Sequence, residues 1–190
     1  MQVAFFLVKT LGYLYIWVLI LRIILQWIRA DYRNPISQFV VRTTNPLVVP
    51  LRRIVPPLRG LDMATFVAVF LVQFLLCVVL IYMATQSIPG FWQLAFVTAL
   101  RLVHATLRLY MFILIVWVIM SWVAAGQYNP VSTLFARLSE PLLAPVRRFI
   151  PPIGGLDLSA LFVIIGLQAL MLLIPIPAGY SVLFWGGGFI

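Results

Sequence analysis

Acidic residues, histidine and cysteine are scarce in this chain of 190 residues, which has four Asp and Glu residues, one His and one Cys. A single cysteine excludes an intrachain disulfide, and a single histidine does not supply the several ligands of a closed metal site. No carboxylates are paired within an apolar segment, so no general acid/base dyad is available. No nucleophile elbow, metal motif or phosphate-binding glycine loop is present either. The sequence therefore predicts a protein that is not an enzyme and that uses neither a metal nor a cofactor.

Charged residues of any kind are rare as well, at 9%, whereas hydrophobic residues make up 64% of the chain. A soluble domain carries about 25% charged and about 45–50% apolar residues. Four apolar stretches are long enough to cross a bilayer. We therefore predict an all-α integral membrane protein with four transmembrane helices, at about residues 10–28, 63–85, 105–123 and 158–174.

The second half of the sequence repeats the first half. Asn34-Pro35 recurs as Asn129-Pro130, a separation of 95 positions (129 − 34), which is half the length of the chain. The same offset relates the Arg52-Arg53 pair to Arg147-Arg148, and Gly60-Leu61-Asp62 to Gly155-Leu156-Asp157. We predict two repeat units, residues 1–95 and 96–190, each consisting of a span, a basic loop and a span.

Basic residues predict the orientation of the chain in the membrane. Because each unit contains two spans, both units insert the same way round and the hairpins are parallel repeats. Nine of the 13 Lys and Arg residues lie in the two loops, residues 29–62 and 124–157. Basic loops favour the cytoplasmic side, which places both termini in the periplasm. This distribution indicates contact with anionic lipid headgroups and argues against nucleic acid as a partner.

The loops are unusually apolar and rich in proline. After Asn129-Pro130, apolar residues recur with helical spacing, which predicts a short amphipathic helix lying in the interface with its apolar side toward the membrane. The dense prolines that follow argue against a long regular helix and predict a kinked, membrane-dipping segment. Six arginines are expected at headgroup level: Arg42, Arg52, Arg53, Arg137, Arg147 and Arg148. Four residues are expected to cap helices: Asn34, Asp62, Asn129 and Asp157.

Polar residues inside the spans are few. Gln73 and Gln168 occupy equivalent positions in the two units, and we expect them to bond to each other as helix–helix contacts; a polar lining is the alternative. Arg22 lies inside the first span and is expected to extend toward the loop side as an anchor. Its counterpart in the second unit is Trp117.

A second basic cluster is expected at the opposite end of the spans. It consists of Lys9, Arg101, His104 and Arg108. The last three lie on one helical face because they are spaced i, i+3 and i+7. The cluster either anchors the helices to lipid phosphates or forms a vestibule that attracts anions.

The loop motif resembles that of a known family. The pattern Asn-Pro, then Pro-Leu-x-x-Pro-x-Arg-Arg-x-x-Pro-Pro, then Gly-Leu-Asp is similar to the YggT family with its YlmG relatives, and both units carry it. The units differ at two positions next to the motif: Asn45 and Arg59 of the first unit correspond to Glu140 and Gly154 of the second. The resemblance implies a small inner-membrane protein of bacteria without known catalysis, linked to osmotic-stress tolerance, ion homeostasis or cell division.

Two functions remain open from the sequence. In the first, the amphipathic loops organise or recruit partners at the cytoplasmic leaflet, the partners being anionic lipids and envelope or division proteins. In the second, the protein is a channel or transport component in ion or osmotic homeostasis. A pore made from four spans would require a homo-oligomer, and the sequence leaves the oligomeric state open.

Overall fold

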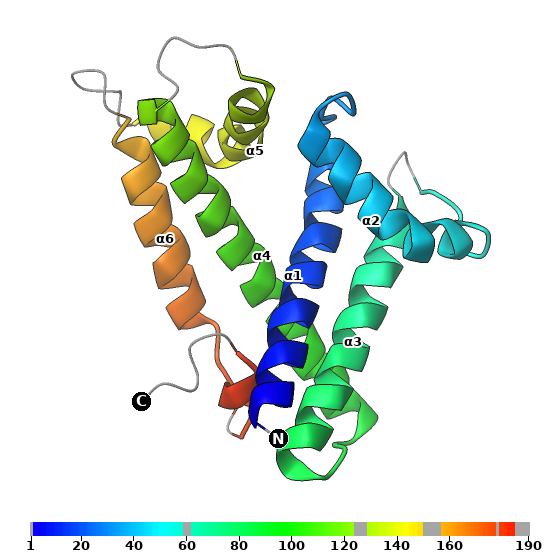
Figure 1. Cartoon of the computed structure of the whole chain (residues 1–190). Helices are drawn as coiled ribbons and strands as arrows, with labels where there is room; N and C mark the ends of the chain where they lie inside the picture. Colours follow the sequence, from blue (N-terminus) through cyan, green and yellow to red (C-terminus); the bar gives the residue numbers. More distant parts are fainter. Residues whose placement is uncertain (1, 59–61, 124–128, 150–156, 178, 185–190) are drawn as a thin grey trace.

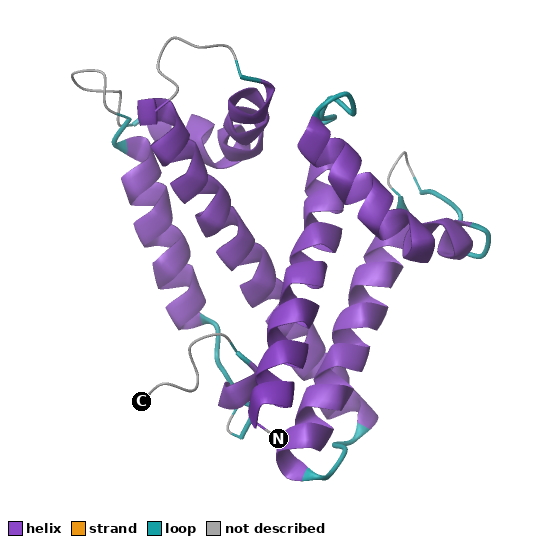
Figure 2. Cartoon of the chain, in the orientation of Figure 1, coloured by secondary structure: helices purple, strands orange, loops and turns teal. Residues whose placement is uncertain are grey.

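The computed structural model describes residues 2–58, 62–123, 129–149, 157–177 and 179–184. These residues form helices and connecting loops, and no strand occurs among them (Figure 2). The helices are α1 (Gln2–Trp27), α2 (Pro35–Arg52), α3 (Met63–Thr85), α4 (Phe91–Val123), α5 (Pro130–Arg147), α6 (Ser159–Leu173) and the short 3-10 helix η1 (Ser181–Leu183).

The helices are arranged in two successive groups of three (Figure 1). In each group, two long helices run between the ends of the molecule and a third lies across one end. Both cross-lying helices, α2 and α5, are at the same end, which we call the loop end. The N-terminus, the α3–α4 connection and η1 are at the other end, which we call the terminal end. Both basic segments of the sequence therefore lie on one side of the helices.

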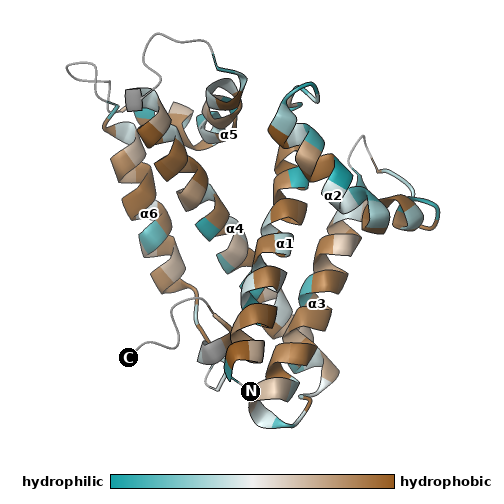
Figure 3. Ribbon diagram, in the orientation of Figure 1, coloured by the Kyte–Doolittle hydropathy of each residue, from teal (hydrophilic) through white to brown (hydrophobic). Residues whose placement is uncertain are grey.

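Three helices are long and apolar enough to cross a membrane, namely α1, α3 and α4. Their residues are mainly hydrophobic, whereas α2 carries more hydrophilic residues (Figure 3). The fourth predicted span corresponds to α6, an apolar helix of 15 residues. At 1.5 Å per residue α6 is about 22 Å long, which is shorter than the roughly 30 Å hydrocarbon core. It stops before Pro175 and Pro177, which cannot continue a helix.

Close packing of α1 on α3 forms the centre of the first group. Gly12 lies so near Leu76 that a Cβ atom on residue 12 would come within 2.5 Å of its side chain. Ala64 and Ala68 on α3 are fully buried. Small residues let helix backbones approach closely, and in a membrane this contact is a main source of helix association. Most of the buried apolar residues belong to one core around α1 and α3, and a smaller core lies between α4, α5 and α6.

The two loop helices are longer than we expected from the prolines in their sequences. Both α2 and α5 contain 18 residues and continue through two prolines each, at Pro46, Pro50, Pro141 and Pro145. The expectation that dense prolines would prevent a long helix was wrong. A proline removes one backbone donor, but Pro46, Pro50 and Pro145 lie on exposed faces, where the carbonyls that lose a partner can bind water or headgroups.

The apolar side of these helices faces the long helices. Val40, Leu134 and Leu138 are buried in the large core. The reason is that α2 and α5 cover the ends of the long helices, and those ends would otherwise expose apolar surface. Phe39 does remain exposed on α2.

Candidate functional site

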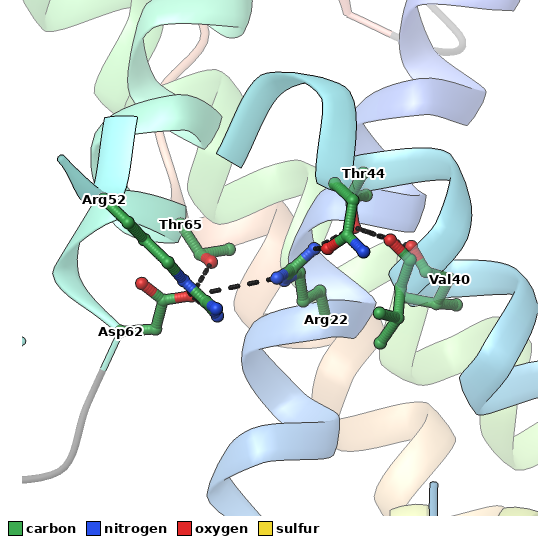
Figure 4. Close-up of polar contacts among 8 residues, drawn as sticks. Arg22, Val40, Thr44, Arg52, Asp62 and Thr65 are labelled. Carbon is green, nitrogen blue, oxygen red and sulfur yellow. Dashed lines mark hydrogen bonds and ion pairs between the residues drawn. The ribbon is translucent and has the colours of Figure 1, made fainter. Parts of the chain in front are cut away.

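A buried arginine joins three helices at the loop end of the first group. Arg22 on α1 donates hydrogen bonds from Nη1 to Thr44 Oγ1 at 2.6 Å and to Asn45 Oδ1 at 3.0 Å, both on α2. Its Nη2 lies 4.0 Å from Oδ2 of Asp62, which immediately precedes α3. Figure 4 shows the guanidinium of Arg22 between Asp62 and Thr44. As predicted, the arginine reaches toward the loop end, where it binds protein groups.

Asp62 is the centre of this network. Its Oδ2 accepts hydrogen bonds from Arg52 Nε at 3.0 Å and from Thr65 Oγ1 at 2.8 Å. Burial disfavours the charged carboxylate, but the hydrogen bonds from Arg52 and Thr65 and the charges of Arg52 and Arg22 outweigh it, so the pKa of Asp62 lies below its ordinary value. Asp62 was expected to cap α3, but its side chain makes no capping bond to the backbone. Its carboxylate interacts with Arg22, Arg52 and Thr65 instead.

The second group contains the corresponding pair without the buried arginine. Arg147 Nε donates to Asp157 Oδ2 at 2.9 Å, and Arg147 Nη1 donates to Glu140 Oε2 at the same distance. Asp157 also accepts bonds from the backbone N–H and the hydroxyl of Ser159 at the start of α6. Burial raises the pKa of Asp157, but the bonds from Ser159 and Arg147 have a larger combined effect and lower it. In this group the carboxylate binds the first backbone N–H of the following helix, whose N-cap position is Leu158.

The two arginines of each pair therefore differ in their partners. Arg52 and Arg147 bind the aspartates, whereas Arg53 and Arg148 are exposed and form no ion pair among the described residues. The side chain of Arg52 is itself 50% exposed. Arg42 and Arg137 are exposed as well. Large apolar side chains lie next to them on the surface. We call this set the loop-end platform: Phe39, Arg42, Arg53, Ile54, Arg137, Arg148 and Phe149.

The starts of the two loop helices contact each other. Asn34 Oδ1 accepts from Ile36 N at 2.9 Å, which caps α2, and Asn34 Nδ2 donates to the carbonyl of Pro130 at 2.7 Å. Asn129 caps α5 by accepting from Val131 N at 2.9 Å. One asparagine thus caps its own helix and also connects the two groups at the loop end.

The two glutamines do not bond to each other. Gln73 is buried on α3 and donates to Cys77 Sγ in the next turn at 3.5 Å, while its Oε1 has no partner among the described residues. Gln168 is exposed on α6 and lines a pocket at the terminal end. The expected symmetric contact was wrong because α3 packs between α1 and α4, whereas α6 lies on the far side of α4.

The terminal-end basic cluster lies deeper than expected for lipid anchors. Arg101 is 1% exposed and His104 is 6% exposed. Lys9 Nζ donates to the carbonyl of Phe184 at 3.2 Å, which holds η1 against α1. Arg101, His104 and Arg108 line the same pocket as Gln168, so three of the four cluster residues share one cavity.

The amino-acid sequence is similar to those of known proteins. The family model described as CCB3/YggT matches residues 1–83 and 96–177. The chain belongs to the CCB3/YggT family. The two matched segments carry α1 to α3 and α4 to α6, respectively, and thus include the arginine–aspartate pair of each group.

Relatives from several bacteria are similar over most of the chain. A Pseudomonas aeruginosa protein named uncharacterized protein PA0392 is 42% identical over 90% of this chain and 87% of its own length. A Vibrio alginolyticus protein encoded in the proC 3′ region is 46% identical over 86% and 88%. The uncharacterized protein YggT of Escherichia coli K12 is 37% identical over 87% and 85%. No solved structure matches the chain.

Within this CCB3/YggT chain, sequence reasoning missed the Arg22 network. Four network residues differ from the residues 95 positions later: Arg22, Thr44, Asn45 and Thr65 correspond to Trp117, Ser139, Glu140 and Ala160. In the structure Arg22 binds both Thr44 and Asn45. Several differences that occur together between the two halves were the available signal that these residues are in contact.

Proposed function

We propose that the protein is a non-enzymatic, multi-pass protein of the bacterial inner membrane whose loop-end platform organises or recruits partners at the cytoplasmic leaflet. In this proposal α6 completes the fourth span, assisted by the residues that flank it. The loop end is cytoplasmic and both termini are periplasmic. Links to osmotic-stress tolerance or to division are part of the proposal and derive from the family resemblance.

The proposal rests on the difference between the two arginines of each pair. Arg52 and Arg147 form ion pairs, whereas Arg53 and Arg148 form none with the residues that the structure describes and are followed by exposed Ile54 and Phe149. Adjacent basic and large apolar side chains suit an interface with headgroups or with a partner held at the membrane surface. Each basic residue near an anionic surface contributes about 1 kcal/mol.

The test is charge reversal of the four exposed arginines, Arg42, Arg53, Arg137 and Arg148, to Glu. We expect the variant to insert and fold normally but to fail to restore growth under osmotic upshift, or normal division, in cells that lack the native protein. The matched control replaces the same four residues with Lys, which keeps the charge and should restore the phenotype. If cells that carry the variant with four glutamates grow and divide normally, the platform is not required for the function of the protein.

A separate experiment tests the orientation of the chain in the membrane. With Cys77 replaced by Ser, single cysteines at positions 53 and 148 should both be protected from a membrane-impermeant thiol reagent in intact cells and react after the membrane is opened. Reaction of either position in intact cells would contradict the proposed topology.

A transport role is the second candidate, and one observation favours it. The terminal-end pocket places Arg101, Arg108 and Gln168 between α1, α4 and α6, which is a polar concavity in an apolar bundle. Purified protein in liposomes should then show ion flux under an osmotic gradient, and flux should change in a Gln168→Leu variant. Absence of flux under every gradient would contradict the transport role.

A further inference from the structure

Arg101 is the most deeply buried cation in the described part of the chain. Its Nη1 lies 3.6 Å from Cys77 Sγ, and its Nε and Nη2 have no hydrogen-bond partner among the described residues. Sulfur is a weak acceptor, and an arginine stays charged in proteins. Burying a charge is unfavourable when no opposite charge compensates for the lost hydration. No opposite charge contacts the guanidinium among the described residues.

The chain has no acidic side chain placed to provide it. The four acidic residues are Asp31, Asp62, Glu140 and Asp157, and all belong to the loop-end segments. Arg101 is near the start of α4 (Phe91–Val123), and α4 begins at the terminal end. Lys9 and Arg108 nearby add positive charge of their own. An anion bound from outside the chain would supply the charge that the described residues do not provide.

A cavity is present for such an anion. Arg101 lines a pocket of about 260 Å³ together with His104, whose Nε2 is also without a partner among the described residues. The ring of His104 is fixed by an edge-on contact with Phe184, with ring centroids 5.0 Å apart. The buried donors of Arg101 thus belong to a residue that lines this pocket beside the ring of His104.

An apolar groove adjoins this pocket. It has a volume of about 400 Å³ and is lined by residues of α1 and α4, among them Leu14, Trp17, Phe112 and Ile115. Tyr13, Arg108 and Met111 line both the groove and the pocket, so the two are continuous. A ligand that fills both has an anionic end and a hydrocarbon end.

We infer that the terminal-end pocket and the groove together bind one anionic phospholipid, with its phosphate at Arg101, beside the ring of His104, and an acyl chain along the groove between α1 and α4. Arginine suits this role because its planar donors bind phosphate oxygens in pairs. The inference concerns the opposite end of the molecule from the platform and does not depend on the proposed function.

The first experiment counts lipids that remain bound to the protein after purification in mild detergent, by native mass spectrometry. The wild type should retain one anionic phospholipid per chain, and Arg101→Gln should lose it. The matched control is Arg53→Gln, the same change at an exposed arginine of the loop end, which should retain the lipid. Equal retention by Arg101→Gln and the wild type, or retention of zwitterionic lipids only, would overturn the inference.

The second experiment separates a lipid from a free anion by measuring thermal unfolding in detergent. Short-chain phosphatidylglycerol should raise the unfolding temperature of the wild type, whereas glycerol phosphate at the same concentration should not. Arg101→Gln should weaken the lipid effect by about tenfold to a hundredfold, because hydrogen bonds to charged groups contribute that much to binding. Equal stabilisation by glycerol phosphate would show an anion site without a lipid.

Two further variants keep the inference testable if Arg101→Gln does not fold. Arg101→Lys keeps the charge but loses the paired donors, and Ile115→Trp fills the groove without touching the pocket. Both should retain less anionic phospholipid than the wild type. If both bind it as the wild type does, neither the donors nor the groove takes part and the inference fails.

Discussion

The two groups of helices contain the same arginine–aspartate pair, Arg52–Asp62 and Arg147–Asp157, and surround it differently. In the first group a second arginine, Arg22, lies close to Asp62 and also binds the neutral side chain of Asn45. In the second group a tryptophan stands where Arg22 would be, and Glu140 adds a second carboxylate. One network therefore has an extra cation and the other an extra anion.

Burial differs along with charge. Arg52 and Arg147 are 50% and 30% exposed, but the side chains of Asp62 and its second partner Arg22 are only 9% and 8% exposed. In the second group Asp157 is 28% exposed and Glu140 is 57% exposed. Exposed ion pairs contribute about 0–1 kcal/mol, whereas removing one partner of a buried pair costs about 3–5 kcal/mol. The comparison indicates that the contact between Arg22 and Asp62 makes the first network the more stabilising of the two.

The largest effect is expected for Asp62→Asn. It leaves the buried Arg22 without its nearest carboxylate and should lower the free energy of unfolding by about 3 kcal/mol or more. Unfolding by heat or SDS in detergent micelles measures the change. Asp157→Asn is the matched variant and should cost about 1 kcal/mol. Equal losses in the two variants would remove the distinction between the groups.

Acidification should produce the next largest loss. The folded-state pKa values of Asp62 and Asp157 lie below the ordinary value of 3.8, so their stabilising contribution is present above that pH and is lost as the pH falls through the lower folded values. Wild-type protein should lose stability below about pH 4 more steeply than the Asp62→Asn/Asp157→Asn double variant. Parallel pH profiles of the two proteins would contradict this assignment.

Asn34 and Asn129 provide a smaller contrast. Asn34→Ala removes a helix cap and the bond to Pro130 and should cost about 2 kcal/mol, whereas Asn129→Ala removes a cap alone and should cost about 1 kcal/mol. Asn34→Asp keeps the cap but loses the donor, and it should fall between the wild type and Asn34→Ala. Thermal unfolding of the four proteins compares them directly. Identical costs for the two alanine variants would show that the bond between the groups contributes nothing.

The smallest effect is expected for Glu140→Asn, which gives the second group the residue found in the first. Glu140 is exposed and Arg147 keeps Asp157 as a partner, so stability should change by no more than about 0.5 kcal/mol. The same thermal measurement applies. A loss above about 1 kcal/mol would mean that the carboxylate supports the second group more than its exposure indicates.

Sequence reasoning located the long apolar helices because apolar length is a property of the local sequence. It also placed Arg52, Asp62 and their counterparts in one loop each, and the ten-residue separation between each arginine and its aspartate is the same in both units. It did not foresee that helix α2 continues past Pro46, because the cost of a proline depends on where the freed carbonyl faces. That direction is set by packing on α1 and α3.

The sequence alone determined that the chain is rich in apolar stretches long enough to cross a bilayer, that the Asn-Pro and Arg-Arg motifs recur 95 positions apart, and that acidic side chains are confined to residues 29–62 and 124–157. These properties follow from composition and spacing. Only the tertiary structure decided that Arg22 on α1 is bound by residues of α2 and by Asp62 before α3, that Gln73 and Gln168 are separated, and that Arg101 lines a cavity. Those outcomes depend on which helix faces meet, and helix packing brings together residues that are far apart along the chain.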